Sequence, residues 1–217
     1  MRGCAFILNG VSTHTGNDLD LVQERKEIGA PEVQFYTVEV PGRNGVLDLT
    51  KSLTGRTTFF NRKINFRYFA SGTLAEILEK IDTLMMYHGE TVRIIDDDTP
   101  AYYYEGSVVV EVDRKPAYAY INLEVDAQPF RMKLEQTENS YTLTETETEV
   151  EIVNPGYAVT PEIVVSDTCV IAKGDTSFNL TAGTYSDISA LILEQGSNVY
   201  TVSGSGTVNI NYREARI

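Results

Sequence analysis

Long stretches rich in β-branched and aromatic residues constrain the fold of this chain more than any other feature of its sequence. Such residues favour strands because their side chains pack well on a pleated, half-buried surface. The last two stretches are separated by the turn-forming residues DRKP, so segments 101–112 and 116–126 are expected to pair as a hairpin. The sequence therefore predicts a mainly β protein. The four stretches are VQFYTVEV (33–40), TTFFNRKINFRYF (57–69), YYYEGSVVVEV (102–112) and AYAYINLEV (117–125).

One amphipathic helix is predicted between these strands, over about residues 74–88. Apolar residues recur there at the spacing of a single helical face. Thr73 followed three residues later by Glu76 fits a capping box, and Gly89 suits the left-handed position after the last turn. Because the rest of its surface is charged, the helix should lie across a sheet. The apolar positions are Leu74, Ile77, Leu78, Ile81, Leu84 and Met85.

The chain changes character near residue 133, which predicts two domains, 1–133 and 134–217. The first carries a net charge of −4 and the second a net charge of −9. The second begins with the alternating segment YTLTETETEVEIV (141–153), predicted to be one strand whose glutamates form a solvated outer face rather than a cation site. Short strands separated by NPG, KGD, TAG, QGSN and SGSG follow, a spacing typical of a β-sandwich.

The segment KLEQTENSYT (133–142) lacks a strong periodic pattern and is expected to be a protease-accessible linker. We therefore expect residues 1–133 to assemble by themselves and residues from about 141 onward to fold as a separate monomer. The residues of the sandwich expected to face inward are Ile163, Val165, Val170, Phe178, Leu180, Ile188, Leu191, Val199, Val202, Val208 and Ile210.

Composition argues against several classes of protein. The formal net charge of −13 opposes general nucleic-acid binding, which requires clustered Lys and Arg. No apolar run approaches the roughly 20 residues of a membrane-spanning helix, and the start MRGCAFILNG fails as a secretory signal and is better explained as a first strand. Cys4 and Cys169 match no metal or redox motif and are expected to be buried free thiols.

Candidate catalytic residues are few. His14 lies in the turn-like STHTGND, and His88 ends the predicted helix, where a cation interacts favourably with the helix dipole. The DDD run at 96–98 is expected to be a solvated turn, because adjacent residues cannot all converge on one metal. PGRNG (41–45) lacks Walker spacing and a following helix, so it predicts a structured turn. With no GxSxG, HExxH, CxxC or GxGxxG motif, the sequence predicts no enzyme, no cofactor and no metal site.

Four segments, in order along the chain, resemble the distal tail protein family of siphophages that infect Gram-positive bacteria. VEVPGRNGVLDLT resembles a segment of the family that consists of a strand, a PGR-x-G turn and the residues LD. TVRIIDDDTPAYYYEGSVV, which follows the predicted helix, resembles a segment of the family with a strand, a DDP-like turn and a Tyr-rich strand. INLEVDAQPF resembles the x-x-P-[FY] element at the end of the family's N-terminal domain. LEQGSNVYTVSGSGTVNINYRE resembles the family's last hairpin, which ends in xYR. The matching positions are Pro41, Gly42, Arg43, Gly45, Asp97, Asp98, Tyr103, Pro129, Phe130, Tyr212 and Arg213.

The resemblance implies an N-terminal ring-forming tail-hub domain, with one helix packed on a sheet, followed by a galectin-like β-sandwich. It implies a structural component of a phage tail tip, a homo-hexameric ring that links the tail tube protein to tail-associated and baseplate proteins. Such a protein is located at the virion tail tip and is made and assembled in the host bacterial cytoplasm.

Other functions remain as alternatives. A galectin-like sandwich invites a carbohydrate-binding lectin, whose sugar site resembles a His and Arg cluster with a stacking Trp, but residues 134–217 contain no His and the chain contains no Trp. A tube-forming tail protein or tape-measure accessory would share the ring symmetry but would not normally carry the C-terminal sandwich. An enzyme is the third alternative, for which no catalytic constellation is found in the sequence.

Overall fold

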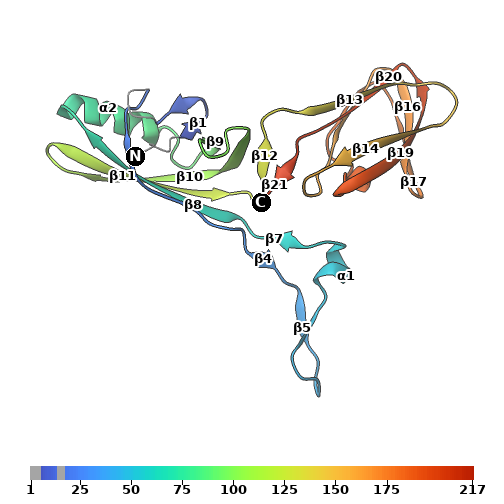
Figure 1. The fold of residues 1–217 in the computed structure, drawn as a ribbon, viewed down its shortest axis with the longest axis horizontal. Helices are drawn as coiled ribbons and strands as arrows, with labels where there is room; N and C mark the ends of the chain where they lie inside the picture. Colours follow the sequence, from blue (N-terminus) through green and yellow to red (C-terminus); the bar gives the residue numbers. More distant parts are fainter. Residues whose placement is uncertain (1–5, 14–17) are drawn as a thin grey trace. The chain divides into compact units, whose positions relative to one another are not determined.

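The computed structural model describes residues 6–13 and 18–217, and the chain divides into two compact units (Figure 1). The first unit contains the residues up to Arg131 together with Ile217, and the second contains Met132–Arg216. Strands dominate both units, which confirms the mainly β fold predicted from the sequence. His14 and Cys4 lie outside the described residues.

An antiparallel sheet forms the first unit, with its strands in the order β2, β1, β9, β10, β11, β8, β3. The predicted hairpin is confirmed, because β10 and β11 pair from Gly106↔Ala127 to Arg114↔Ala119. The strands are β1 (Phe6–Leu8), β2 (Val11–Ser12), β3 (Val22–Ile28), β8 (Arg62–Ser71), β9 (Thr91–Asp96), β10 (Tyr102–Arg114) and β11 (Tyr118–Ala127).

The core of this unit lies on one face of the sheet. Burial alternates along β8, so that Ile64, Phe66 and Tyr68 are buried while Lys63 and Arg67 on the other face are exposed. The alternation arises because successive side chains of a strand point to opposite faces. The buried face is therefore apolar, and the opposite face is mostly polar apart from Phe69, Tyr118 and Tyr120, whose rings pack together on it.

The helix α2 (Leu74–Met85) packs on β8, β10 and β11, which confirms the predicted helix on a sheet. Its capping box is present. The Thr73 hydroxyl accepts from the Glu76 backbone N–H at 3.3 Å, and the Glu76 carboxylate accepts from the Thr73 N–H at 2.7 Å. The backbone N–H of Thr73 holds the pKa of Glu76 below its ordinary value. The helix ends at Met85, three residues before the end predicted at about residue 88, and Gly89 has the expected positive φ of 85°.

His88 has a different environment from the one predicted. It follows α2 in a turn, and its Nδ1 lies 3.1 Å from the backbone N of Val110, in position to accept that N–H. The next residue continues this contact, because the Gly89 N–H donates to the Val108 carbonyl at 2.8 Å. His88 therefore extends the pairing of β10 and lies beyond the last turn of α2, which ends at Met85 and not at His88 as predicted.

Residues 33–60 leave the sheet between β3 and β8 and form what we call the arm (Figure 1). The strands of the arm pair only with each other, β4 with β7 and β5 with β6. The short helix α1 was not predicted. The elements are β4 (Val33–Gln34), β5 (Thr37–Glu39), β6 (Val46–Asp48), α1 (Thr50–Thr54) and β7 (Thr58–Phe59).

The second unit contains two four-stranded antiparallel sheets that share one hydrophobic core, as expected of a β-sandwich. One sheet has the order β13-β20-β15-β18 and the other β14-β19-β16-β17. The elements are β13 (Thr137–Thr142), β14 (Thr148–Asn154), β15 (Glu162–Val165), β16 (Thr168–Lys173), β17 (Thr176–Leu180), β18 (Gly183–Tyr185), the 3-10 turn η1 (Ser189–Leu191), β19 (Gly196–Ser205) and β20 (Thr207–Tyr212). Two further short strands, β12 (Arg131–Lys133) and β21 (Ala215–Arg216), lie outside these two sheets and pair with each other.

The predicted single Thr/Glu strand is wrong, because it is divided between the two sheets. β13 ends at Thr142 and β14 begins at Thr148, with Leu143 buried where the chain crosses. The four glutamates of this segment are exposed, as expected of a solvated face. The predicted linker is also wrong for residues 137–142, since they pair with β20 along the whole of β13.

Most of the residues expected to face inward in the second unit do so, with two exceptions. Val170 and Val199 are 39% and 49% exposed, and their neighbours Ile171 and Tyr200 take the buried positions. Cys169 is a buried free thiol, as predicted, and burial raises its pKa.

Candidate assembly surface

The arm is organised around Thr50, the first residue of α1. Thr50 is buried, its Oγ1 accepts from the Tyr36 N–H at 2.9 Å, and its own N–H donates to Asp48 Oδ1 at 2.8 Å. The hydrogen bonds from the Thr50 hydroxyl and N–H lower the pKa of Asp48 below its ordinary value. A further backbone bond joins the Leu49 N–H to the Tyr36 carbonyl at 2.8 Å. These bonds hold α1 against the start of the hairpin and give the arm a defined conformation.

Large apolar side chains are exposed along the whole arm. Their exposed fractions range from 40% to 67%, although residues of these types are mostly buried in globular proteins. Val38 of β5 and the residues that flank this strand, Tyr36 and Val40, lie on one face, and Leu47 of β6 is directly opposite Val38. The hairpin therefore presents an apolar face. The exposed residues are Phe35, Tyr36, Val38, Val40, Val46, Leu53 and Phe60.

The arm has little to stabilise it in isolation. A two-stranded hairpin is marginally stable at best in water, and β5 and β6 have only three residues each. Contiguous exposed apolar surface generally marks an interaction site. The arm also differs in charge from the rest of the chain, because residues 33–60 carry a net +1 in a protein of net −13. These properties make the arm a candidate interaction surface.

A second exposed apolar surface lies on α2. Ile77, Ile81 and Leu84 are buried against the sheet, whereas Leu74, Leu78 and Met85 are 52%, 37% and 42% exposed. At about 100° per residue these three side chains fall within roughly 40° of one another around the helix axis. They form a stripe beside the buried one, which we call the α2 stripe. Met86, just after the helix, is 78% exposed.

The PGRNG segment forms the turn at the tip of the arm, between β5 and β6. Its residues are exposed, and the Arg43 N–H donates to the Val40 carbonyl at 3.1 Å. Gly42 and Gly45 have φ angles of 80° and 75°, which side chains other than glycine rarely adopt. Pro41, Gly42, Arg43 and Gly45 thus lie together, in a tight turn of the kind predicted.

The DDD run is a solvated turn only in part: Asp97 and Asp98 are exposed in a turn, as predicted, whereas Asp96 ends β9 and is buried. Asp96 is only 4% exposed, and the Lys26 ammonium lies 2.5 Å from both Asp96 Oδ1 and Asp98 Oδ2. The hydrogen bond and charge of Lys26 lower the pKa of the exposed Asp98. Asp97 lies in the turn between them. Lys26, which sequence reasoning missed, is 70 residues from Asp96 in the chain and carries no local signal of this contact.

The remaining motif residues lie at separate places within their own units. Tyr103 is buried on β10 under the Arg93 guanidinium, 4.9 Å from the ring centre. Pro129 and Phe130 follow β11, and the Phe130 ring meets Phe59 of β7 edge-on at 5.6 Å. Phe130 therefore supports the base of the arm.

Two motif residues lie in the second unit. The Tyr212 hydroxyl donates to the Val153 carbonyl at 2.8 Å and so connects β20 of one sheet to β14 of the other. Burial raises the pKa of Tyr212. Arg213 Nη1 donates to the carbonyls of Lys133, at 3.2 Å, and Leu134. The motif positions therefore occupy a turn, an ion-pair cluster and packing contacts rather than one convergent site.

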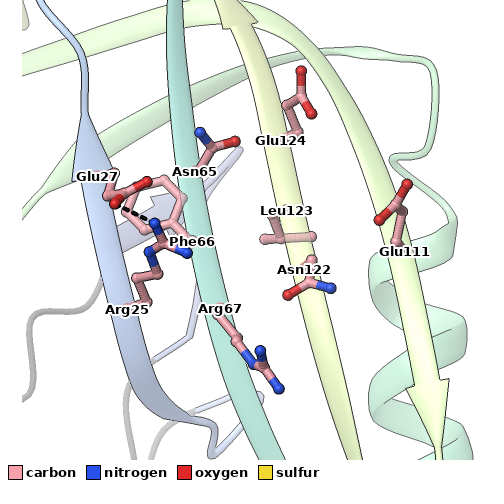
Figure 2. Close-up of a pocket in the computed structure, with 9 residues that line it drawn as sticks. All are labelled: Arg25, Glu27, Asn65, Phe66, Arg67, Glu111, Asn122, Leu123 and Glu124. Atoms are coloured by element: carbon pink, nitrogen blue, oxygen red, sulfur yellow. Dashed lines mark hydrogen bonds and ion pairs between the residues drawn. The ribbon is translucent and has the colours of Figure 1, made fainter.

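A hollow of about 330 Å³ lies on the polar face of the sheet in the first unit (Figure 2). Arg25 and Arg67 line it together with Glu27, Glu111 and Glu124, from strands β3, β8, β10 and β11. Most of its charges pair with neighbouring side chains. Arg25 contacts Glu27 at 2.5 Å, and Lys63 beside the hollow contacts Glu124 at 2.9 Å. The hollow is thus lined mostly by paired charges on a sheet surface.

Within residues 6–13 and 18–217, no group of three or more His, Cys, Asp or Glu side chains is arranged to hold a metal ion. Over the same described segments, no helix has the length and apolar character required to cross a membrane.

Comparison with known proteins identifies a structural relative of this chain. No family model and no curated protein matches the chain. Among solved structures, the chain is similar to the SPP1 Dit (gp 19.1) protein, described as a paradigm of the hub adsorption apparatus in Gram-positive infecting phages. The TM-score is 0.65 at 14% sequence identity, and the match covers 99% of each chain. The chain therefore has, over almost its entire length, the fold of this phage Dit protein.

Proposed function

We propose that this protein is a non-enzymatic structural component of a phage tail tip, which associates with copies of itself into a hexameric ring and links the tail tube to tail-tip and baseplate proteins. The observation that carries the proposal is the arm, which exposes seven large apolar side chains on a hairpin too small to be stable alone. The full-length similarity in fold to the SPP1 Dit protein supports the same function.

The proposal assigns ring assembly to the first unit and the outer position to the second. Both exposed apolar surfaces belong to the first unit, whereas residues 134–217 carry a net charge of −9. Six strongly acidic units repel each other at close range, and this repulsion falls off over roughly 8 Å at physiological ionic strength. The second units, which we propose to be galectin-like, therefore lie apart from each other at the rim.

Light scattering and negative-stain imaging of the purified chain test this function. We expect a particle of six times the 24.1 kDa chain mass, seen as a ring with a central hole. Fragments cut before β13 separate the roles of the units, and the fragment up to residue 131 should keep the oligomer. A chain that stays monomeric at tens of micromolar, both alone and with neighbouring tail proteins, would contradict the proposal.

Lectin activity is the alternative, and it makes the opposite prediction for sugar binding. Aromatic stacking and charged hydrogen-bond donors generally create galactoside sites, and the chain contains no Trp. We expect no measurable binding to simple β-galactosides on a glycan array. Binding that survives removal of residues 1–133 would favour the lectin instead.

A further inference from the structure

Two apolar surfaces of the first unit are exposed at the same time, the arm and the α2 stripe. Of the 19 exposed large hydrophobic side chains in the described segments, seven lie on the arm and four on α2 or directly after it. The concentration of exposed apolar side chains in these two segments is far above that of the rest of the chain. Both surfaces therefore require a covering partner.

The arm cannot cover the helix of its own chain. β8 connects the two, because it begins at Arg62, two residues after the end of the arm, and ends at Ser71, two residues before the Thr73 cap of α2. A strand of ten residues separates its ends by roughly 30 Å, at about 3.3 Å per residue. Figure 1 shows the arm leaving the sheet at the end away from α2. Contact between arm and helix thus requires a second copy.

The two surfaces are complementary in chemistry. Leu53 on α1 is 67% exposed, and Lys51 beside it gives this end of the arm positive charge. The α2 stripe has Glu79 and Asp82 along its open side, and residues 74–85 carry a net charge of −2. An apolar centre with opposite charges at its rim is the usual composition of a specific protein interface.

We propose that the arm of each copy docks on the α2 stripe of a neighbouring copy. This inference rests on the proposed function and names the surface that receives the arm. The contact is heterologous, because a different patch is used on each partner, and heterologous contacts generate closed rings when their rotation closes. Each copy then donates one arm and receives another, so every exposed stripe in the ring is covered.

Single substitutions on each side of the contact test the proposal by light scattering of the full chain. Leu53→Glu places a charge in the apolar centre of the arm, and Leu74→Glu does so on the stripe. Both sites are more than half exposed, and Glu at the first position of a helix suits its positive end, so both chains should fold. Each change should raise the concentration needed for assembly at least about tenfold.

Mixing the two variants gives the sharpest result. Leu53→Glu keeps an intact stripe and Leu74→Glu keeps an intact arm, so one docking contact forms per pair and the ring cannot close. The mixture should therefore contain dimers of twice the 24.1 kDa chain mass, at a concentration at which each variant alone is monomeric. Val153→Glu is the matched control, because Val153 is 59% exposed but lies in the second unit, and it should leave the oligomer unchanged.

The outcomes separate this inference from the function on which it rests. Wild-type-sized rings formed by Leu74→Glu would overturn the α2 docking site and leave ring formation standing. Monomers in the mixture, with both variants shown folded by far-UV circular dichroism, would also overturn the docking site. A wild-type chain that never assembles, alone or with neighbouring tail proteins, would overturn the proposed function and this inference together.

Discussion

Replacing Lys26 by methionine tests how the first unit is held together across its sheet. Lys26 lies on the edge strand β3 and contacts Asp96 at the end of β9, and the sheet order separates these strands by β10, β11 and β8. The side chains of Lys26 and Asp96 are only 16% and 5% exposed, whereas that of Asp98 is 66% exposed. Lys26 therefore ties two strands that are not neighbours, through one buried and one exposed carboxylate.

The expected cost follows from this burial. Two unit charges about 4 Å apart attract by about 4 kcal/mol at an effective dielectric constant of about 20, and desolvation offsets part of this gain. Lys26→Met keeps the apolar stem but leaves the Asp96 carboxylate buried without its cation. We expect the free energy of unfolding to fall by about 2–4 kcal/mol. Asp98→Asn, which removes the solvent-exposed partner, should cost far less.

Urea unfolding followed by far-UV circular dichroism measures these differences. The double variant Lys26→Met/Asp96→Asn completes a thermodynamic cycle, and its loss should be smaller than the sum of the single losses by at least about 1 kcal/mol. The reasoning fails if Lys26→Met lowers the free energy of unfolding no more than Asp98→Asn does. It also fails if the loss in the double variant equals the sum of the losses in Lys26→Met and Asp96→Asn.

The same cluster predicts a dependence on alkaline pH. Burial alone would lower the pKa of Lys26, but its hydrogen bonds to Asp96 and Asp98 and the charges of these carboxylates raise it above the ordinary 10.5. A raised folded-state pKa means that the stabilisation is fully present below pH 10.5 and is lost as the pH rises through the folded value. The stability gap between wild type and Lys26→Met should therefore be constant around neutrality and narrow above that pH.

Three further substitutions test packing elsewhere. Gly106→Ala should cost more than about 3 kcal/mol or abolish soluble expression, because a Cβ at Gly106 would clash with the backbone of Asp126 on β11. Tyr200→Phe should lower the free energy of unfolding in urea by about 1–2 kcal/mol, since the buried hydroxyl donates to the Leu191 carbonyl at 2.8 Å and would leave that acceptor unpaired. Arg62→Met should raise the melting temperature, with a gain of about 1 kcal/mol, because Arg62 is 4% exposed, burial lowers its pKa, and its Nε and Nη2 have no hydrogen-bond partner. An unchanged or lower melting temperature would show that this buried charge is stabilising.

Features that depend on neighbouring residues were predictable from the sequence. The Thr73–Glu76 capping box, the β10–β11 hairpin and the left-handed Gly89 each follow from interactions within a few residues, and all are present. The apolar spacing of α2 correctly located the helix. It did not show that Leu74, Leu78 and Met85 would remain exposed, because a periodic pattern does not reveal how much of an apolar stripe the sheet covers.

The candidate surface was only partly predictable. The motif residues PGRNG were correctly expected to form a turn, but nothing local indicated that this turn ends an arm of exposed apolar residues. Segment 33–40 was expected to be a strand and contains two short ones, β4 and β5, whose partners lie within the arm. Sequence patterns record the preference for extended backbone, whereas exposure depends on whether another element packs on it.

The sequence by itself determined the mainly β character, the single long helix with its cap and the change of composition near residue 133, because strand and helix preferences and charge are properties of local segments. Only the tertiary structure decided which carboxylate Lys26 meets, that Val170 and Val199 face outward, and that residues 143–147 cross between two sheets. These outcomes depend on contacts between residues far apart in the chain. The burial of one side chain or one charge is set by what the rest of the fold places against it, and no local pattern carries that information.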